Sequence, residues 1–514
     1  MDAFLQQHAG SVTACLSGFD RLRFRGTLRM LANVTGMFRF LCYTRHLLKD
    51  FGAYAQQLSR KVRFESLARA EALGRPVVHL DSPSVSKEQL AMDLAGQQSI
   101  TRGLIAIYTA VEPCQSYDIQ SDRQSGHLEL IPRYRKCQHL YHYQIHPVFG
   151  FMHARLQTWL PFSLTVNING REWLSRQMDA AGIGYRRADN CFTFVDDPEA
   201  AQRLLDRQVR FDFAGQLGRL AEQVNPALRS IIGGYDVGYY WSLDQSEWAT
   251  DILFRSRQEL ARLYPGLVRH GIESFGSKDV MRFLGRSVER GITPRFAGEV
   301  VSDLKQRPEG MRIKHRVNLN SVKMYDKAGC VLRVETTLND VHDLQSPRVV
   351  KGKKVWKRMR KGVADIPERA RVSQASNGRY LEALAAVKTP LPLKTLTDEL
   401  SRPVKWKKQQ VRGLNLLAAD DARLLEAIGR GEFVINGLRN RDLQALLFGS
   451  SDDPAEKKRR CGRVTRMLRM LRAHGLIHKL PHTHRYQVSD KGRKVIAAIH
   501  AAREADIEKL AKAA

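Results

Sequence analysis

Apolar and polar residues alternate in short stretches through the first part of the chain, and this pattern predicts strands. Four segments share the strand character: residues 12–28, 102–111, 140–145 and 164–168. Residues 171–181 instead have the spacing of an amphipathic helix, which we expect to end at Gly182. Residues 1–215 are therefore predicted to form a mixed α/β domain with a catalytic or a nucleic-acid-binding role.

Helical spacing dominates the next part of the chain. It is clearest at residues 245–264 and 278–290. Alternation returns at residues 311–337, around a turn at residues 326–329, and predicts a β-hairpin. We therefore expect residues 216–345 to be a helical insertion in the α/β part, followed by a hairpin.

A strongly basic segment follows, with one tryptophan at Trp356. Blocks of charge are usually solvated, so one interpretation is an exposed helix face. The charge here is almost entirely positive, which favours an arm or linker that folds on nucleic acid. This basic arm is assigned to residues 346–385, and a separate domain is expected over residues 386–514.

The C-terminal part has the most specific pattern. The order is helix, short strand, helix, long basic amphipathic helix, strand–turn–strand and final helix: residues 420–428, 433–438, 440–448, 455–474, 476–490 and 491–510. This order, together with the passage LRAHGLIHKLPHTHRYQVSDKGR, resembles bacterial winged helix-turn-helix domains over about residues 418–510. The resemblance implies a recognition helix that enters the major groove. A winged helix used for protein contacts is the other interpretation.

Net charge narrows the class of partner. The chain carries 83 Lys and Arg against 53 Asp and Glu, a formal net charge of +30. Such an excess destabilises a compact fold unless a polyanion offsets it, so DNA or structured RNA is the expected partner. A basic ribosome-like or membrane-surface protein is the alternative. The expected nucleic-acid-binding residues are Arg21, Arg23, Arg25, Lys351, Lys353, Lys354, Trp356, Lys357, Arg358, Arg360, Lys361, Lys457, Lys458, Arg459, Arg460, Arg463, Arg466, Arg469, His484 and Arg485.

Other sequence features bear on location. We find no apolar run of about 18 residues and no signal peptide, so no membrane partner is expected. The seven cysteines are scattered, and no CxxC occurs, which predicts reduced thiols and a cytoplasmic protein.

Four acidic residues are candidates for catalysis. Asp20 lies in the first predicted strand, Glu112 ends the apolar strand, and Glu247 and Asp251 are one turn apart on a predicted helix. Carboxylates of this kind hold Mg²⁺ in nucleases, and their order resembles the RNase H-like layout. We expect Asp20, Glu112 and Asp251 to be the metal ligands. Ordinary ion pairs, a turn cap and a solvated helix face are the alternative interpretations.

Two further sequence patterns bear on other kinds of chemistry. The passage KMYDK…LRVE resembles a segment of the replication initiators of filamentous phages, which implies Tyr325 as a nucleophile. Those initiators also have histidines at alternate positions of one strand, and this chain lacks that triplet. Zinc is not expected as a cofactor, because Cys114, Cys137, His139, His142 and His146 match no usual ligand spacing.

Together these patterns predict a nucleic-acid-binding protein of the mobile-element type. It would combine an α/β part, RNase H-like in layout, with a C-terminal winged helix and a Mg²⁺-dependent nuclease or transposase-like activity. The main alternative is a non-enzymatic protein that binds structured RNA in a ribonucleoprotein. A replication initiator and a transcription regulator are further alternatives.

Overall fold

The computed structural model contains the whole chain. It describes all residues except 83, 123–125, 287–298, 308–309, 351, 387–392, 408, 417, 431–432, 434–436, 482 and 505–514. The chain forms two compact units. Unit 1 comprises Met1–Ala14, Asp251–Thr336 and Gln374–Ala514, and unit 2 comprises Cys15–Thr250 and Thr337–Ser373.

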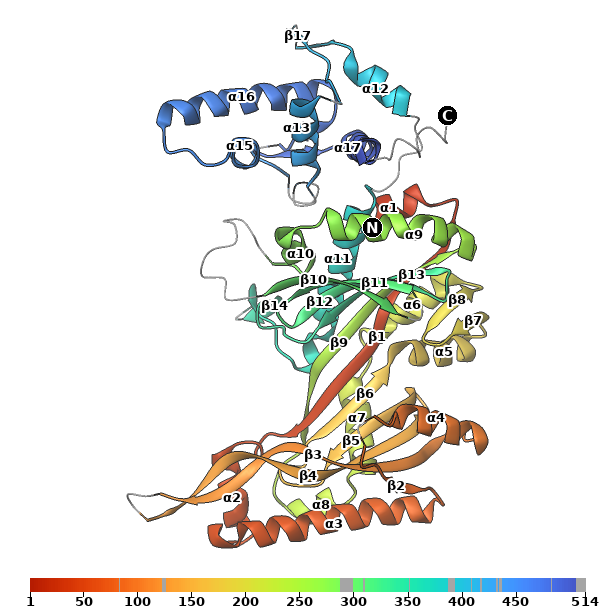
Figure 1. Cartoon of the computed structure of the whole chain (residues 1–514). Helices are drawn as coiled ribbons and strands as arrows, with labels where there is room; N and C mark the ends of the chain where they lie inside the picture. Colours follow the sequence, from red (N-terminus) through yellow and green to blue (C-terminus); the bar gives the residue numbers. More distant parts are fainter. Residues whose placement is uncertain are drawn as a thin grey trace. The chain divides into compact units, whose positions relative to one another are not determined.

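A large mixed sheet contains most of the strands. Its order is β10-β11-β12-β13-β9-β1-β6-β5-β4-β3-β2 (Figure 1). The strand bounds are β1 Val12–Leu28, β2 Val77–His79, β3 Gly103–Ser121, β4 Leu128–His146, β5 Gly150–Gln157, β6 Leu164–Asn169, β9 Tyr239–Phe254, β10 Val300–Arg307, β11 Gly310–Val317, β12 Asn320–Lys327 and β13 Val331–Leu338. β2 runs parallel to β3, whereas β3, β4, β5, β6 and β1 pair antiparallel in that order.

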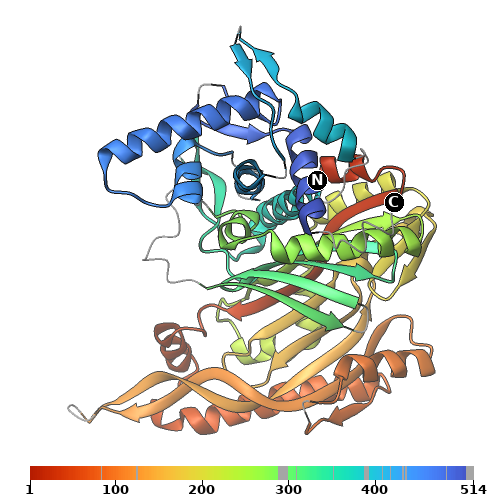
Figure 2. The same ribbon diagram turned by 45° about the horizontal axis from the view of Figure 1, so that its top comes forward.

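Helices cover the sheet of unit 2. They are α2 Val34–Tyr43, α3 Phe51–Ala72, α4 Lys87–Gln97, α5 Gly170–Ala181, α6 Pro198–Gln208, α7 Phe213–Val224 and α8 Leu228–Ile232, with a short 3₁₀ turn at Leu48–Asp50. β3 and β4 form a long twisted ribbon (Figure 2), and α3 packs against β3. Two hairpins complete the unit, β7 Tyr185–Ala188 with β8 Cys191–Val195 and β14 Gln345–Val350 with β15 Lys353–Arg358.

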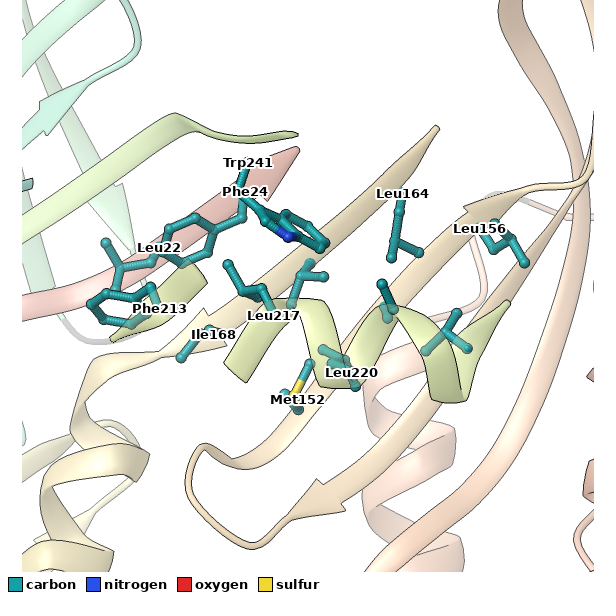
Figure 3. Close-up of a cluster of buried hydrophobic side chains, with 14 of the residues drawn as sticks. Leu22, Phe24, Met152, Leu156, Leu164, Ile168, Phe213, Leu217, Leu220 and Trp241 are labelled. Atoms are coloured by element: carbon teal, nitrogen blue, oxygen red, sulfur yellow. The ribbon is translucent and has the colours of Figure 1, made fainter. Parts of the chain in front are cut away.

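The core of unit 2 follows from the alternation along β1. Leu22 and Phe24 are fully buried, while the intervening arginines lie on the other face. Phe213 and Leu217 of α7 pack with them in the same buried cluster, beside Ile168 of β6 (Figure 3). Removing such side chains from water contributes roughly 1.5–3 kcal/mol each, which fixes the register of β1 against β6.

One turn of this unit shows why its sequence is constrained. The side chain of Asn169 caps α5 by accepting hydrogen bonds from the backbone N–H groups of Arg171 and Glu172. A Cβ atom on Gly170 would lie 1.8 Å from the carbonyl oxygen of Phe19, so only glycine fits there. Gly182 ends the helix with φ 67°, as expected from the sequence.

Besides β10, β11, β12 and most of β13 of the large sheet, unit 1 contains several further elements. They are α1 Asp2–Gln7, α9 Arg257–Glu273, α10 Ser277–Phe283, α12 Leu393–Ser401, α13 Ala419–Gly429, α15 Asn440–Phe448, α16 Pro454–Ala473, α17 Asp490–Glu504, and the strand pairs β16 Val404–Trp406 with β17 Gln409–Val411 and β18 Ile477–Lys479 with β19 Tyr486–Val488. Leu424, Leu443, Leu468 and Val495 belong to one buried cluster that joins α13, α15, α16 and α17.

Most of the predicted C-terminal elements are confirmed. α13, α15, α16, the β18–β19 hairpin and α17 lie where the pattern placed them. Half of the predicted strand at residues 433–438, namely 434–436, lies outside the described residues. Of the residues described there, Phe433 is helical and Leu438 forms an isolated bridge with Tyr486.

The structure departs from several predictions about the middle of the chain. Residues 245–254 belong to strand β9, and helix α9 begins only at Arg257. The basic arm is the antiparallel β14–β15 hairpin, followed by a 3₁₀ turn and helix α11 Ile366–Leu384. The hairpin predicted around the turn at residues 326–329 is confirmed as β12 and β13, but the segment 311–337 also includes the separate strand β11. The helix predicted at 278–290 is shorter than expected, because α10 ends at Phe283 and residues 284–286 are not helical; residues 287–290 lie outside the described residues.

Candidate functional site

Three buried carboxylates meet on neighbouring strands of the large sheet. Asp20 lies on β1, Glu247 on β9 and Glu335 on β13, and β13, β9 and β1 are adjacent in the strand order. Each residue offers one carboxylate oxygen, and these three oxygens lie within 4.8 Å of one another. Hard oxygen ligands at this spacing suit Mg²⁺ or Mn²⁺.

Two residues that follow β6 in the chain, Arg171 and Asn190, hold the side chain of Asp20. The amide nitrogen of Asn190 donates to both carboxylate oxygens at 3.1 Å. The guanidinium of Arg171 is fully buried and lies 3.8 Å from Asp20. Arg171 also donates to the carbonyl oxygen of Ala249 on β9, at 3.1 Å. These contacts fix the carboxylate of Asp20 and place a positive charge behind it.

Two side chains of β12 hold the carboxylate of Glu335. Its two carboxylate oxygens accept hydrogen bonds from the Lys323 ammonium at 2.5 Å and the Tyr325 hydroxyl at 2.7 Å. Burial raises the pKa of Glu335. The charges of Lys323 and Arg333 and the two hydrogen bonds outweigh that effect, so the pKa lies below its ordinary value. Glu335 is therefore a carboxylate at neutral pH.

Glu247 and Asp251 have different surroundings. Four residues along a strand span about 13 Å, so they are not the close pair that a helix would have made. The amide of Gln245 donates to Glu247 at 3.2 Å. Asp251 accepts two hydrogen bonds from the guanidinium of Arg333, at 2.6 and 2.8 Å, and both side chains are buried. Asp251 therefore forms a buried bidentate ion pair.

Glu112 has a different environment from the three clustered acids. It lies on β3 and binds the Tyr141 hydroxyl at 2.5 Å and Arg155 at 2.9 Å. Burial raises the pKa of Glu112, but Tyr141, Arg155, His139 and Lys87 together lower it below its ordinary value. The structure thus brings Asp20 and Glu247 together with Glu335, and within the described part of the chain neither Glu112 nor Asp251 belongs to that group.

The contribution of Glu335 was missed because it had been read as part of a hairpin. The charged residues within β13 are the signal that could have identified it. Every residue of β13 is buried, yet the strand contains Arg333 and Glu335. Charged residues are almost never fully buried unless they are paired or bind an ion. Two charged residues within a fully buried strand are therefore a reason to look for their partners in space.

The histidines and cysteines considered for zinc have partners within unit 2. His139 lies 3.3 Å from the Cys137 carbonyl oxygen, and His142 bonds the Ser66 hydroxyl at 2.7 Å. His146 accepts from the backbone N–H groups of residues 148 and 149. Tyr325, the nucleophile implied by the phage-initiator resemblance, uses its hydroxyl to hold Glu335.

A second group of functional candidates is the basic surface of α16. Lys457, Lys458 and Arg466 are exposed, and within the described residues no carboxylate forms an ion pair with them. Arg459 and Arg460 instead pair with Glu456 of the same helix at 2.8 and 2.7 Å.

Other contacts tie this helix to the rest of the C-terminal region. Arg463 lies 3.4 Å from Asp420, and Arg469 donates to Gln409. A hollow of about 690 Å³ lies beside α16, where the start of α15 faces the β18–β19 hairpin. Thr465 of α16 and His484 and Arg485 of the hairpin line it.

The remaining basic candidates lie in unit 2. Arg21 is exposed, and Arg25 pairs with Asp244 at 2.8 Å. Trp356 is 55% exposed, and the side chains of Lys357, Arg358 and Arg360 are exposed beside it. Arg23 and Lys361 are half-buried. Lys351 lies outside the described residues, as do the side chains of Lys353 and Lys354.

Comparison with known proteins gives no relative. No protein-family model, no curated protein and no solved structure matches the chain. Within the described residues, every helix is too short or too polar to cross a membrane. The candidate sites therefore stand on their own geometry.

Proposed function

We propose that the C-terminal region binds nucleic acid as a winged-helix domain, with α16 as its recognition helix. The observation that carries this proposal is the exposed cationic face of α16 next to the β18–β19 hairpin. Lys458, Thr465 and Arg469 share one side of the helix and Arg466 lies next to it, while Lys457 is exposed in the first turn of the helix. Unpaired cations on one helix release counterions when they contact phosphates.

The order of elements supports the same proposal. Three helices, α13, α15 and α16, are followed by a two-stranded hairpin and the helix α17. Leu468 and Leu471 of α16 are buried in the core of this region, so the opposite side of the helix faces outward. A helix held in this way can place exposed side chains against base edges while its flanking cations contact phosphates.

The test is binding of the full chain to labelled duplex DNA and duplex RNA, followed by fluorescence anisotropy. The variant Lys457→Ala/Lys458→Ala/Arg466→Ala should bind at least tenfold more weakly than the parent. The matched control Lys49→Ala/Arg203→Ala/Arg229→Ala removes three exposed cations from unit 2. It should bind like the parent. Equal affinities for the two triple variants would contradict the proposal.

A second candidate function is a divalent-metal-dependent nuclease or transposase-like activity, with RNase H-like placement of the acids. The observation that favours it is the meeting of Asp20, Glu247 and Glu335. All three offer oxygen ligands, which is the donor set that Mg²⁺ takes in such enzymes. A bound Mg²⁺ would activate water and stabilise the leaving oxygen of a phosphodiester. Asn190 and Lys323 would keep two of the carboxylates in place.

The experiment is a comparison of Glu247→Gln and Glu335→Gln with Glu112→Gln. Mg²⁺ or Mn²⁺ should raise the melting temperature of the parent and support cleavage of DNA or RNA. Glu247→Gln and Glu335→Gln should lose both responses, because an amide is a weaker metal ligand than a carboxylate. Glu112→Gln is the matched control and should keep both.

Retention of cleavage by all three variants would refute this site. A parent chain that shows no metal response, and that copurifies with one defined RNA, would instead favour the non-enzymatic ribonucleoprotein alternative.

A further inference from the structure

The hollow beside α16 is unusual in its chemistry. Its volume of about 690 Å³ is within the range of small-molecule sites, roughly 300–1,000 Å³. Among the described residues that line it are three arginines, Arg439, Arg441 and Arg485, and none of these residues is Asp or Glu. A concave surface that gathers positive charge without carboxylates attracts an anion more strongly than a flat surface does.

The arginines come from two sides of the hollow. Arg439 and Arg441 flank the start of α15, and Arg485 comes from the hairpin. The nearest carboxylate to Arg441 is that of its neighbour Asp442, at 3.9 Å, and the backbone N–H of Arg439 donates to Asp442 at 2.8 Å. Asp442 is thereby engaged in starting the helix, and the guanidinium groups of both arginines can bind a phosphate.

Aromatic surface lines the same hollow. The rings of Tyr486 and His484 line the hollow, together with the apolar side chain of Leu468. The Tyr486 ring is half-buried, and the guanidinium of Arg472 lies 5.8 Å from its centroid. A planar ring beside cations can stack an unpaired base, which contributes about 1–3 kcal/mol per base.

We propose that this hollow binds one unpaired nucleotide of a nucleic-acid strand. Arg439 and Arg441 would hold its phosphate, and Tyr486 would stack its base. The inference rests on the proposed nucleic-acid function and deepens it. Thr465 shares the side of α16 that bears Lys458 and Arg469, so a strand on the basic face can continue into the hollow. The protein would therefore prefer frayed or overhanging ends to blunt duplexes.

The experiment uses the full chain and two labelled DNA probes of one sequence. One probe is a blunt duplex, and the other has a single-nucleotide overhang carrying 2-aminopurine. The parent should bind the overhang probe about tenfold more tightly, and the 2-aminopurine fluorescence should fall as the base stacks. Arg439→Ala/Arg441→Ala should lose the preference and the fluorescence change.

The matched control is Lys457→Ala/Lys458→Ala, which removes two cations of α16 that lie outside the hollow. It should weaken both probes alike and keep the preference. Equal binding of the two probes by the parent, or an unchanged preference in Arg439→Ala/Arg441→Ala, would overturn the inference and leave the nucleic-acid function standing. Binding of neither probe would refute the proposed function itself. Adenosine monophosphate that competes as well as the overhang would show a free-nucleotide site and overturn the strand assignment.

Discussion

Buried histidines on β4 and β5 show how single residues tie the stability of unit 2 to pH. Burial, reinforced by nearby arginines, lowers the pKa of His139, His142, His146 and His153 to about 4. In the unfolded chain a histidine has a pKa of about 6.5. The folded state therefore binds protons less readily than the unfolded state between these two pH values.

The sign of the effect follows from that difference. Above about pH 6.5 both states are neutral, and the histidines add no pH dependence. As the pH falls from about 6.5 towards 4, the unfolded chain takes up protons and the free energy of unfolding decreases. For His142 alone this loss is about 2 kcal/mol at pH 5, from about 1.4 kcal/mol per pKa unit.

We therefore predict that His142→Gln reduces the acid sensitivity of the protein. The free energy of unfolding, measured with urea at pH 7.5 and pH 5, should fall by about 2 kcal/mol less in the variant than in the parent. The glutamine can still bond Ser66, which limits the cost at pH 7.5. His478→Gln, at an exposed position outside unit 2, is the control and should leave the difference unchanged. Equal pH dependence in all three proteins would contradict the prediction.

Charged residues inside β9 and β13 have roles that residue type alone does not reveal. Asp251 and Glu335 are both buried acids, yet Asp251 binds Arg333 through two hydrogen bonds while Glu335 lies with Asp20 and Glu247. Removing one partner of a buried pair such as Asp251 with Arg333 costs about 3–5 kcal/mol, because the other charge remains buried. A loss of activity in an Asp251 variant would thus report lost stability rather than lost chemistry.

At the scale of elements, alternation identified those strands that have one buried face and one polar face. β1, with Phe24 inside and Arg25 outside, was predicted with the correct bounds. β9 was not, because almost all its residues from Ser246 onward are buried on both faces. Periodicity vanishes in such a strand, and its acids then resemble the polar face of a helix.

The candidate site was predictable only in part, for the same reason. Asp20 was predicted as a metal ligand and Glu247 only as a catalytic candidate, whereas Glu335 required knowledge that β13 and β9 are neighbours. Pairing between strands far apart in sequence is decided by burial of whole faces, which a local pattern does not contain. The C-terminal helices were easier, because α16 shows its apolar stripe within one segment.

The basic arm illustrates a different limit. Residues 346–385 were predicted to be an arm or linker that folds on nucleic acid, but Leu344 and Met359 are buried with Val341 in a small cluster. Arg348 pairs with the buried Asp365 at 2.5 Å. A few apolar residues and one ion pair thus fix the hairpin, while Lys357 and Arg358 stay exposed on it. High charge alone does not predict disorder when such anchors are present.

At the scale of the whole molecule, the net charge of +30 is carried by both units. We interpret two exposed basic surfaces as contacts to one nucleic acid: the α16 face in unit 1 and the β14–β15 hairpin in unit 2. Each cation that contacts a phosphate makes the plot of log K against log salt steeper by about 0.9. The salt dependence of affinity therefore counts the contacts that each surface makes.

We predict that the losses from the two surfaces add. Lys457→Ala/Lys458→Ala/Arg466→Ala should make the slope shallower by about 2–3, and Lys357→Ala/Arg358→Ala/Arg360→Ala should do the same. The slope for the sextuple variant should be shallower by about 5, as measured by anisotropy of a long duplex between 50 and 300 mM KCl. A slope that responds only to the α16 substitutions would mean that the charge of the hairpin contributes solubility rather than contact. Additive losses would instead show that a single nucleic acid engages both surfaces. If the two surfaces bound nucleic acid independently, substitutions in one surface would leave the slope measured for the other unchanged.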